Sequence, residues 1–424
     1  MKDSLYKMSL VVIICFLFGL CNGISSPVAV VFTFFILLLN TNRHTAGFFL
    51  LMYGGVWGGA VRSLYPIIPL YGLLLNIIGI YLVRDLIGKV LFRHKSSLIA
   101  MSLTFVVFCI AYFIGPRTAF ASTKLLNIFQ NGIFFLCAYL TLSNSRQISI
   151  RDVAILLLFT SVFLISYAVN IYQISPSSLV DFNWFRQGLQ AYRYRTGDDL
   201  LVDYQEVGMN ATYAFALLLS LKEKPKDLYV LSAIAIFLTL ISGARQSLLA
   251  CVVVVFFRYA YFNNVRSLKK ILLLFFAVAL VFCVYSVLLT SNIEAVTSTL
   301  ESGDEERNFI WLLSLKLFYD SPMYGLGLGG FAPYSPDNPW SHNIILEILC
   351  ECGVFGFVSL FLIVIDYWIN QRVKIKQLSH TQFYYFLALI PLLVRIMVSA
   401  DFRLSIAIFC AIFAISNTKK TIKS

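Results

Sequence analysis

The chain has 424 residues, of which 59% are hydrophobic and 13% are charged, and its formal net charge is +12. A soluble domain carries about 25% charged residues, so this composition excludes an ordinary soluble protein and predicts a polytopic membrane protein. The Lys and Arg residues lie in short clusters between apolar segments, and this distribution argues against a nucleic-acid-binding surface.

Apolar segments of about the length that crosses a bilayer, roughly 17–25 residues, recur along the whole chain. We therefore expect an all-α integral membrane protein with about 12–14 transmembrane helices in a single membrane domain over residues 1–424. The candidate spans are residues 7–22, 26–41, 46–61, 64–83, 97–114, 123–142, 152–172, 207–222, 227–243, 246–262, 270–290, 343–369, 381–400 and 403–416.

The distribution of positive charge predicts the orientation of these spans. With the N-terminus in the cytoplasm, most of the 33 Lys and Arg residues fall on the cytoplasmic side, as the positive-inside rule requires. Both termini are then cytoplasmic, and two long polar segments, residues 175–206 and 291–342, lie on the outer face. The first mixes Arg with Trp and Tyr, which suits either a solvated loop or a lid that faces a sugar or a phosphate.

Candidate metal ligands and nucleophiles are scarce in this chain. The nine Cys residues are scattered through apolar runs without a CxxC pair, which is typical of small packing residues. The outer segments contain no Asp-x-Asp pair, HExxH, P-loop or GxSxG sequence. We therefore expect no metal and no cofactor.

The most informative polar residue is His342, at the end of the second outer segment. An apolar span follows it at once and carries Asn343, Glu347 and Glu351, which share one face of a helix because they are four residues apart. A carboxylate inside a membrane is a functional candidate by default. His342 is therefore a candidate catalytic residue, with Asn343, Glu347 and Glu351 in support. The alternative is a histidine that only caps the helix or lies at the interface.

Three arginines are candidate partners for anions. Arg245 lies between Ser242 and Ser247 at the outer end of a span, and Arg307 follows an acidic run and starts an amphipathic segment. A guanidinium grips phosphate bidentately, although each arginine can equally be a membrane anchor. Arg395 lies roughly 7 Å inside the last-but-one span. We expect it to pair with Glu347 or, less favourably, Glu351; the alternatives are that it reaches the surface or serves as a third phosphate ligand.

The segment between Arg307 and His342 also contains Gly325-x-Gly327-x-x-Gly330, which formally matches a dinucleotide-binding sequence. That fingerprint requires a preceding strand inside a βαβ unit, and here it lies between membrane segments. We expect these glycines to allow a tight return of the backbone to the membrane instead.

From Gly208 to Phe357 the sequence resembles the O-antigen polymerase and O-antigen ligase superfamily of bacterial envelope glycosyltransferases. The resemblance lies in three motifs: Ser-Gly-x-Arg (Ser242–Arg245), an Arg with an aromatic run that ends in Asp-Ser-Pro and Gly-x-Gly (Arg307–Gly330), and His-Asn-x-x-Leu with a later Glu-x-Gly-x-x-Gly (His342–Gly356). In this comparison Arg245 and Arg307 match arginines that hold a diphosphate, and His342 matches an essential histidine.

The resemblance implies a metal-independent, C-type glycosyltransferase of the bacterial inner membrane with a periplasmic active site. Its donor would be an oligosaccharide linked to undecaprenyl diphosphate.

We favour a polymerase, which adds the glycan to another lipid-linked repeat unit, because the outer segment before His342 is only moderately long. The alternatives are a ligase, which uses lipid A-core as the acceptor, and a lipid-glycan flippase or other transporter. The expected partners are membrane lipid and a chain-length regulator or flippase, and no nucleic acid.

Overall fold

A computed structural model describes residues 35, 37–64, 71–93, 95–144, 147–174, 184–196, 202–221, 226–262, 308–336, 339–371, 380–398 and 402–415. These residues form α-helices and one short 3-10 helix, and no strand occurs among them. The predicted spans 7–22 and 270–290 lie outside the described residues, as does most of 26–41. The predicted all-helical class is confirmed for the described residues.

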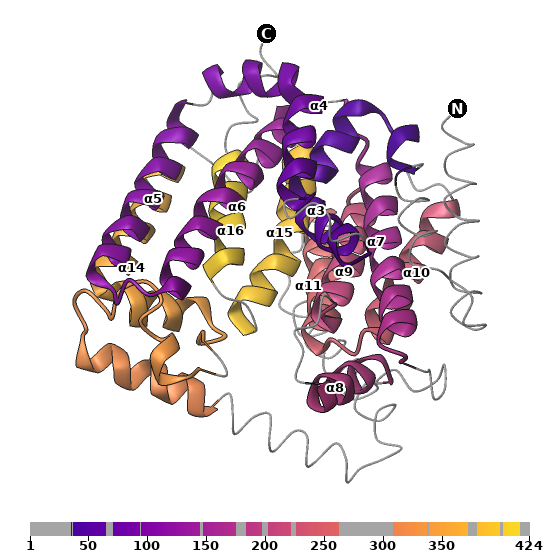
Figure 1. The fold of residues 1–424 in the computed structure, drawn as a ribbon. Coiled ribbons are helices and arrows are strands. Elements are labelled where there is room, and N and C mark those ends of the chain that lie inside the picture. The colour runs from indigo at the N-terminus through magenta and orange to yellow at the C-terminus, as the bar shows by residue number, and fades with distance from the viewer. Residues whose placement is uncertain are drawn as a thin grey trace. The chain divides into compact units, whose positions relative to one another are not determined.

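The chain divides into two compact units, each built from two stretches of sequence. Unit 1 comprises residues 1–83 and 146–292, and unit 2 comprises residues 84–145 and 293–424. Unit 1 holds α3 (Arg43–Leu64), the first half of α4 (Tyr71–Arg93), α7 (Ile150–Ile171), α8 (Trp184–Thr196), α9 (Tyr204–Ser220), α10 (Lys226–Ile241) and α11 (Arg245–Phe262) (Figure 1).

Helix α7 is the core of unit 1. Every residue from Val153 to Ala168 is buried, because α3, α9 and α10 all pack against this helix. A helix that is apolar on all sides is stable only when it is surrounded. Ser149 caps its N-terminus by accepting a hydrogen bond from the backbone N–H of Asp152 at 3.3 Å.

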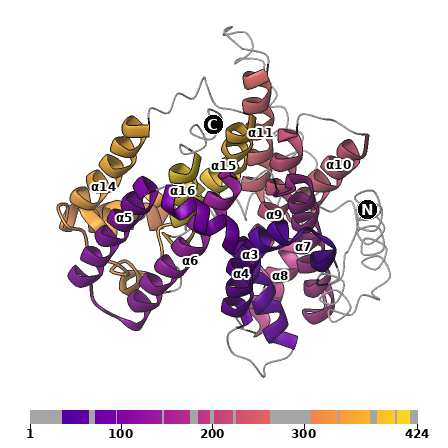
Figure 2. The same ribbon diagram turned by 90° about the horizontal axis from the view of Figure 1, so that it is seen from above.

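Unit 2 holds the second half of α4, α5 (Lys95–Ile114), α6 (Ala119–Asn144), a helix at residues 308–320, η2 (Ala332–Tyr334), α14 (Ile344–Gln371), α15 (His380–Val398) and α16 (Phe402–Ile415). Helix α16 packs on α6, and α14 packs along α5, as Figures 1 and 2 show. The side chain of Ser97 on α5 ties α14 and α16 together, since its hydroxyl lies 2.7 Å from Tyr367 Oη and donates to the carbonyl of Phe413 at 3.0 Å.

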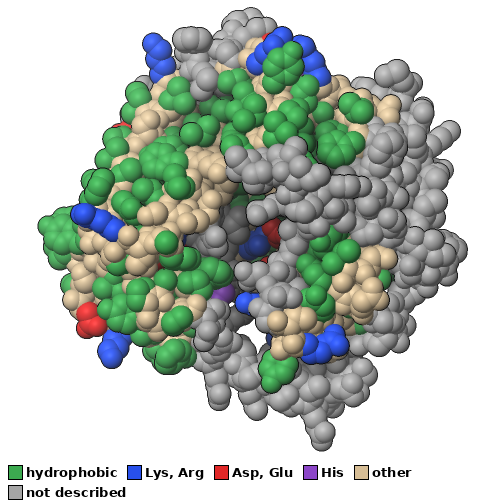
Figure 3. All heavy atoms as spheres, viewed as in Figure 1, with side chains coloured by type: hydrophobic (Ala, Val, Ile, Leu, Met, Phe, Trp, Pro, Cys, Tyr) green, Lys and Arg blue, Asp and Glu red, His purple; other side chains and the backbone are tan. Residues whose placement is uncertain are grey.

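Helix α5 presents one apolar face to its surroundings and another to the unit. Its exposed residues repeat at helical spacing: Ile99, Leu103, Val106, Ile110 and Phe113. Hydrophobic side chains cover much of the described surface in Figure 3. A stripe of large apolar side chains on the outside is the pattern of a helix in lipid. Among the described helices, Lys95–Ile114, Ile150–Ile171 and Ile344–Ile369 are long and apolar enough to cross a membrane, consistent with a polytopic membrane protein.

Helix boundaries agree with the predicted spans where these fall on described residues, apart from span 64–83, which is found as α4 at Tyr71–Arg93. One span differs in kind. The predicted continuous span 343–369 is interrupted at Gly353, where φ is 65° and ψ is −172°. Residues 344–352 therefore form a short helix of their own, which we call the half-helix, and the long helix resumes at Val354.

The Gly-rich segment satisfies the backbone groups that this break frees. The N–H of Leu326 donates to the carbonyl of Cys350 at 2.8 Å, and the N–H of Val354 donates to the carbonyl of Pro322 at 2.9 Å. The N–H of Leu328 donates to the carbonyl of Ala111 at the end of α5, also at 2.9 Å. Backbone groups that are freed by a break and withdrawn from water need hydrogen-bond partners, and this segment supplies them.

The glycines of this segment are needed for its close approach to α5 and α14. Gly325, Gly327 and Gly329 have positive φ, whereas Gly330 does not. A Cβ on Gly325 would lie 2.6 Å from the carbonyl carbon of Glu351. The segment makes tight turns at Gly325, Gly327 and Gly329, whereas Gly330 has an ordinary φ.

Substitution of Gly353 by Ala is expected to destabilise unit 2. The backbone angles of Gly353, φ 65° and ψ −172°, are ones that essentially only glycine adopts, so a side chain there costs about 1–3 kcal/mol, and the new Cβ would also collide with the carbonyl oxygen of Met323. Because that oxygen belongs to backbone, the clash cannot be relieved by a rotamer change. The thermal unfolding midpoint of the detergent-purified variant should therefore fall by several degrees.

The matched control is Gly55→Ala on α3, since a Cβ at Gly55 would meet no atom within 4 Å. Ala is favoured over Gly in a helix by roughly 1 kcal/mol, so this variant should be as stable as the parent or more so. An unfolding midpoint of Gly353→Ala equal to that of the control would show that α14 tolerates an unbroken helix.

Candidate functional site

His342 lies directly before the half-helix in a strained backbone conformation. Its φ is 55°, a value that few non-glycine residues adopt and that occurs at functional sites when the surroundings enforce it. Its ring is half-buried and makes an edge contact with Trp340, with ring centroids 6.0 Å apart and an angle of 78° between the planes. The imidazole is thus placed by fixed backbone and not by a mobile loop tip.

Asn343 is the residue that fixes the start of the half-helix. Its side-chain oxygen accepts hydrogen bonds from the N–H groups of Ile345 at 2.9 Å and Leu346 at 3.2 Å, which is the N-cap arrangement. Its side-chain amide donates to the carbonyl of Met397 near the end of α15 at 3.2 Å. Asn343, the residue that follows His342, therefore joins the start of the half-helix to α15.

Glu347 and Glu351 point to the same side of the half-helix and share one buried cation, Lys124 of α6. Lys124 Nζ lies 2.5 Å from Glu347 Oε1, and 3.0 Å and 2.9 Å from the two carboxylate oxygens of Glu351. The side chains of all three residues are at most 1% exposed. An ammonium has three N–H donors, and here each has a carboxylate oxygen within reach.

The predicted partner of these carboxylates is wrong. Among the described residues their ion pairs come from Lys124 and not from Arg395. Arg395 lies in the last turn of α15, two residues before the carbonyl that binds Asn343. Its Nε is buried without a hydrogen-bond partner in the described part of the chain, so the alternative of an anion ligand remains for this residue.

Lys124, which stands near the start of the predicted span 123–142, was not singled out from the sequence. The signal that could have identified it is a match of opposite charges. Lys124 is a cation inside one apolar span, and another apolar span carries two carboxylates. Sequence spacing cannot say which helices face each other, and 223 residues separate Lys124 from Glu347.

Arg245, in unit 1, is the first residue of α11 and is half-buried. The turn before it is made by Ser242, Gly243 and Ala244, with Gly243 at a φ of 65°. Ser242 Oγ donates to the carbonyl of Thr239 at 2.7 Å and accepts from the N–H of Ala244 at 3.2 Å. This turn allows α11 to start abruptly, so that Arg245 lies at a helix N-terminus, where backbone N–H groups attract anions.

Two buried side chains beside Arg245 have unused donors. Gln246 Nε2 and Ser247 Oγ have no hydrogen-bond partner among the described residues, although Gln246 is only 8% exposed and Ser247 is fully buried. Gly208 of α9 closes the other side, since a Cβ there would lie 2.7 Å from Ser247 Oγ. A buried orphan donor is costly unless a ligand or water satisfies it, which favours the predicted anion site at Arg245 over a simple membrane anchor.

Arg307 lies outside the described residues, as do the acidic residues before it. The amphipathic segment that follows is helical over residues 308–320, as predicted. Its inner face buries Ile310, Ser314 and Leu317, and its outer face exposes Phe309, Leu312 and Tyr319. An exposed apolar face on a short helix favours the predicted position at a membrane surface.

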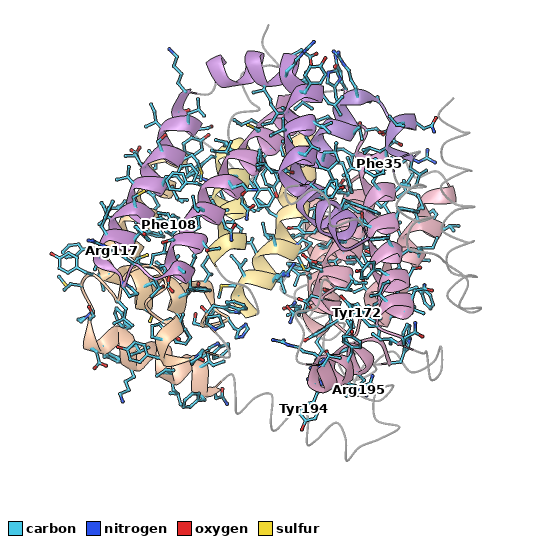
Figure 4. The ribbon with its side chains drawn as sticks, in the orientation of Figure 1. Phe35, Phe108, Arg117, Tyr172, Tyr194 and Arg195 are labelled. Atoms are coloured by element: carbon cyan, nitrogen blue, oxygen red, sulfur yellow. The ribbon has the colours of Figure 1, made fainter. Side chains whose placement is uncertain are left out.

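The first predicted outer segment, 175–206, contains a helix that was expected only as loop. Helix α8 buries Trp184, Phe185 and Leu189 against its own unit. Its last turn carries Arg193 and Arg195, and Tyr194 is 94% exposed. In Figure 4, Tyr194 and Arg195 project outward from the end of α8. These side chains are free to meet a ligand, as a sugar- or phosphate-facing lid requires.

Within the described residues there is no group of three or more His, Cys, Asp or Glu that can hold a metal ion. The residues that the structure brings together in unit 2 are His342, Asn343, Glu347, Glu351 and Lys124. Arg245, with Gln246 and Ser247, forms a separate cluster in unit 1.

Residues 229–361 match the protein-family model described as O-antigen ligase. The matched segment starts in α10 and ends in α14, so it includes Arg245, Arg307, His342 and the half-helix, and leaves out Lys124 and Arg395. A comparison with curated proteins finds no match. The family match agrees with the three motifs seen in the sequence and supports the resemblance of residues 229–361 to the O-antigen polymerase and ligase superfamily.

Proposed function

We propose that this protein is a glycosyltransferase that takes an oligosaccharide from undecaprenyl diphosphate and adds it to another lipid-linked repeat unit. The observation that carries this proposal is the position of His342, which is held in a strained conformation at the start of the half-helix within the matched segment. The expected location is the periplasmic face of the bacterial inner membrane, with both termini in the cytoplasm.

The reaction exchanges one bond at the anomeric carbon of the donor sugar. An acceptor hydroxyl oxygen forms a new bond to that carbon, and the bond from the carbon to the diphosphate oxygen breaks. Undecaprenyl diphosphate leaves with the electron pair, and His342 takes the proton of the acceptor hydroxyl as general base. A diphosphate is already a good leaving group, so the protein has mainly to orient it and stabilise its developing charge.

The residues around Arg245 suit the leaving group. The guanidinium can hold two diphosphate oxygens at once, and the unused donors of Gln246 and Ser247 can bind others. Arg307 is proposed as a second ligand of the diphosphate on the strength of its motif. Asn343 supports the reaction indirectly, because it fixes the first turn of the helix that follows His342.

Polymerase and ligase share this donor and differ in the acceptor. The moderate length of the outer segment before His342 favours a polymerase. The second candidate is a ligase that transfers the glycan to lipid A-core, and it is favoured by the description of the matching family model, O-antigen ligase.

Complementation separates the two candidates. The gene is expressed in one strain that lacks the polymerase and in another that lacks the ligase, each supplied with the matching repeat unit, and lipopolysaccharide is separated on a gel. A polymerase restores a ladder of bands only in the first strain. Transfer of glycan to lipid A-core in the second strain would assign the protein as a ligase, and rescue of neither strain would contradict both assignments.

A further inference from the structure

The half-helix has little intrinsic stability of its own. Gly353 ends it after residues 344–352, and isolated helices shorter than about 12–15 residues are marginal. Its position therefore depends on contacts to neighbouring elements. This matters for function because the half-helix follows His342 directly, so that any shift of its axis moves the imidazole.

Within the part of the chain that the structure describes, polar contacts to other elements hold the half-helix at its start, near its end and in its middle. Asn343 joins its start to the carbonyl of Met397, and the carbonyl of Cys350 accepts the N–H of Leu326 near its end. Between them, Lys124 binds Glu347 and Glu351 from α6. Only the middle contact is made of charged side chains and reaches two successive turns of the half-helix.

The composition of this charged cluster is unusual for a purely stabilising contact. One ammonium binds two carboxylates, and all three side chains are withdrawn from solvent. Buried ion pairs are often replaced by apolar residues without loss of stability. Apolar residues cannot reproduce the directional hydrogen bonds by which one ammonium holds two carboxylates on successive turns of the helix.

We propose that Lys124 is a positioning residue, which fixes the half-helix through Glu347 and Glu351 and thereby holds His342 in its reactive position. This inference rests on the proposed role of His342 in glycan transfer. In this role Lys124 does not touch substrate, because it is buried and its three donors are directed at carboxylates.

The decisive variant removes all three charges together: Lys124→Met combined with Glu347→Gln and Glu351→Gln. Lys124→Met alone removes the ammonium that both buried carboxylates bind and is expected to harm assembly, whereas the triple variant neutralises all three members of the cluster. Glu351→Gln alone provides a milder test, because it keeps the close pair of Lys124 with Glu347. Lys124→Arg keeps a cation that can bind two carboxylates and should recover part of the rate lost in Lys124→Met.

The matched control is Ser97→Ala. It removes another buried polar contact to α14 in the same unit, at Tyr367 and therefore beyond the break at Gly353. If loss of any interhelical tie were enough to slow transfer, this control would be slow as well. We expect it to lower the unfolding midpoint slightly and to leave the transfer rate unchanged.

Two measurements are made on the purified full-length proteins. Amide hydrogen exchange of the peptides that cover residues 342–352 reports the half-helix without any need for activity. Transfer kinetics with the lipid-linked oligosaccharide give kcat and KM for the donor. The triple variant should exchange faster in these peptides and lose kcat by about 10–100-fold, the effect of a displacement of about 1 Å, while KM stays within about twofold because Arg245 and Arg307 are untouched.

The outcomes separate this proposal from the proposed function. Unchanged exchange in the triple variant, or faster exchange with a wild-type kcat, would overturn the positioning role. A loss that appears only as a raised KM would also overturn it. If the parent protein transfers no glycan at all, the proposed function has failed, and the positioning role in catalysis fails with it. Faster exchange in the triple variant would still show that the cluster of Lys124, Glu347 and Glu351 stabilises the half-helix.

Discussion

Replacement of His342 by alanine is expected to abolish glycan transfer while the protein still accumulates in the membrane. Loss of a general base typically lowers a rate by about 10²–10⁴-fold. The imidazole is half-buried beside Trp340, and the side chain that caps α14 is that of Asn343, so the helix should still form. The measurement is the rate of chain growth, normalised to the amount of inserted protein.

The backbone conformation of His342 requires a second variant. An alanine at a φ of 55° is strained, so a loss of activity in His342→Ala can reflect backbone movement as well as the missing imidazole. Asparagine adopts the left-handed region more easily but is no base. His342→Asn should therefore fold like the parent and remain inactive; wild-type rates from either inserted variant would show that His342 is only an interfacial residue.

Replacement of Arg245 or Arg307 by lysine is expected to slow transfer strongly although the positive charge is kept. Lysine is a point charge without the guanidinium fork that binds two phosphate oxygens, and loss of one donor to a developing oxyanion typically costs about 10²–10³-fold in rate. For Arg245, the neighbouring donors of Gln246 and Ser247 remain in place, so its variant should retain the higher residual rate.

Arg117→Lys is the control for this series. Arg117 lies outside the matched segment, is exposed, and donates a hydrogen bond to the carbonyl of Phe113 at 3.1 Å, with its guanidinium over the ring of the same residue. A lysine there should leave the transfer rate unchanged. If lysine at both Arg245 and Arg307 preserves full turnover, charge alone is sufficient and the bidentate geometry is wrong.

The helices of this protein are determined locally, and for that reason the sequence predicted them well. A membrane span is set by the length of an apolar run and by the residues at its ends, and α7 and α14 begin within two residues of their predicted starts. Asn343 was singled out because it shares a helix face with Glu347 and Glu351, and its contacts with N–H groups two and three residues away are local as well. Each of the three family motifs likewise consists of residues that lie close together in the sequence.

The interruption of α14 and the partner of its carboxylates were decided by tertiary structure. Gly353 was visible as part of a motif, but a glycine alone does not break a helix. The break is stabilised because the segment around Gly325 supplies hydrogen bonds to the freed backbone. In the same way, the position of Arg395 within an apolar run did not specify which side chains face it.

The sequence by itself therefore determined the all-helical class, most of the span boundaries, the membrane location and the three motifs that point to envelope glycan transfer. Only the tertiary structure decided that Lys124 holds Glu347 and Glu351, that Gln246 and Ser247 keep unused donors beside Arg245, and that α8 lies within a segment expected as loop. The physical reason is the range of the interactions. Apolar length and helix capping act over a few residues, whereas a buried charge is satisfied by whichever helix packs against it, and here that helix is 223 residues away in sequence.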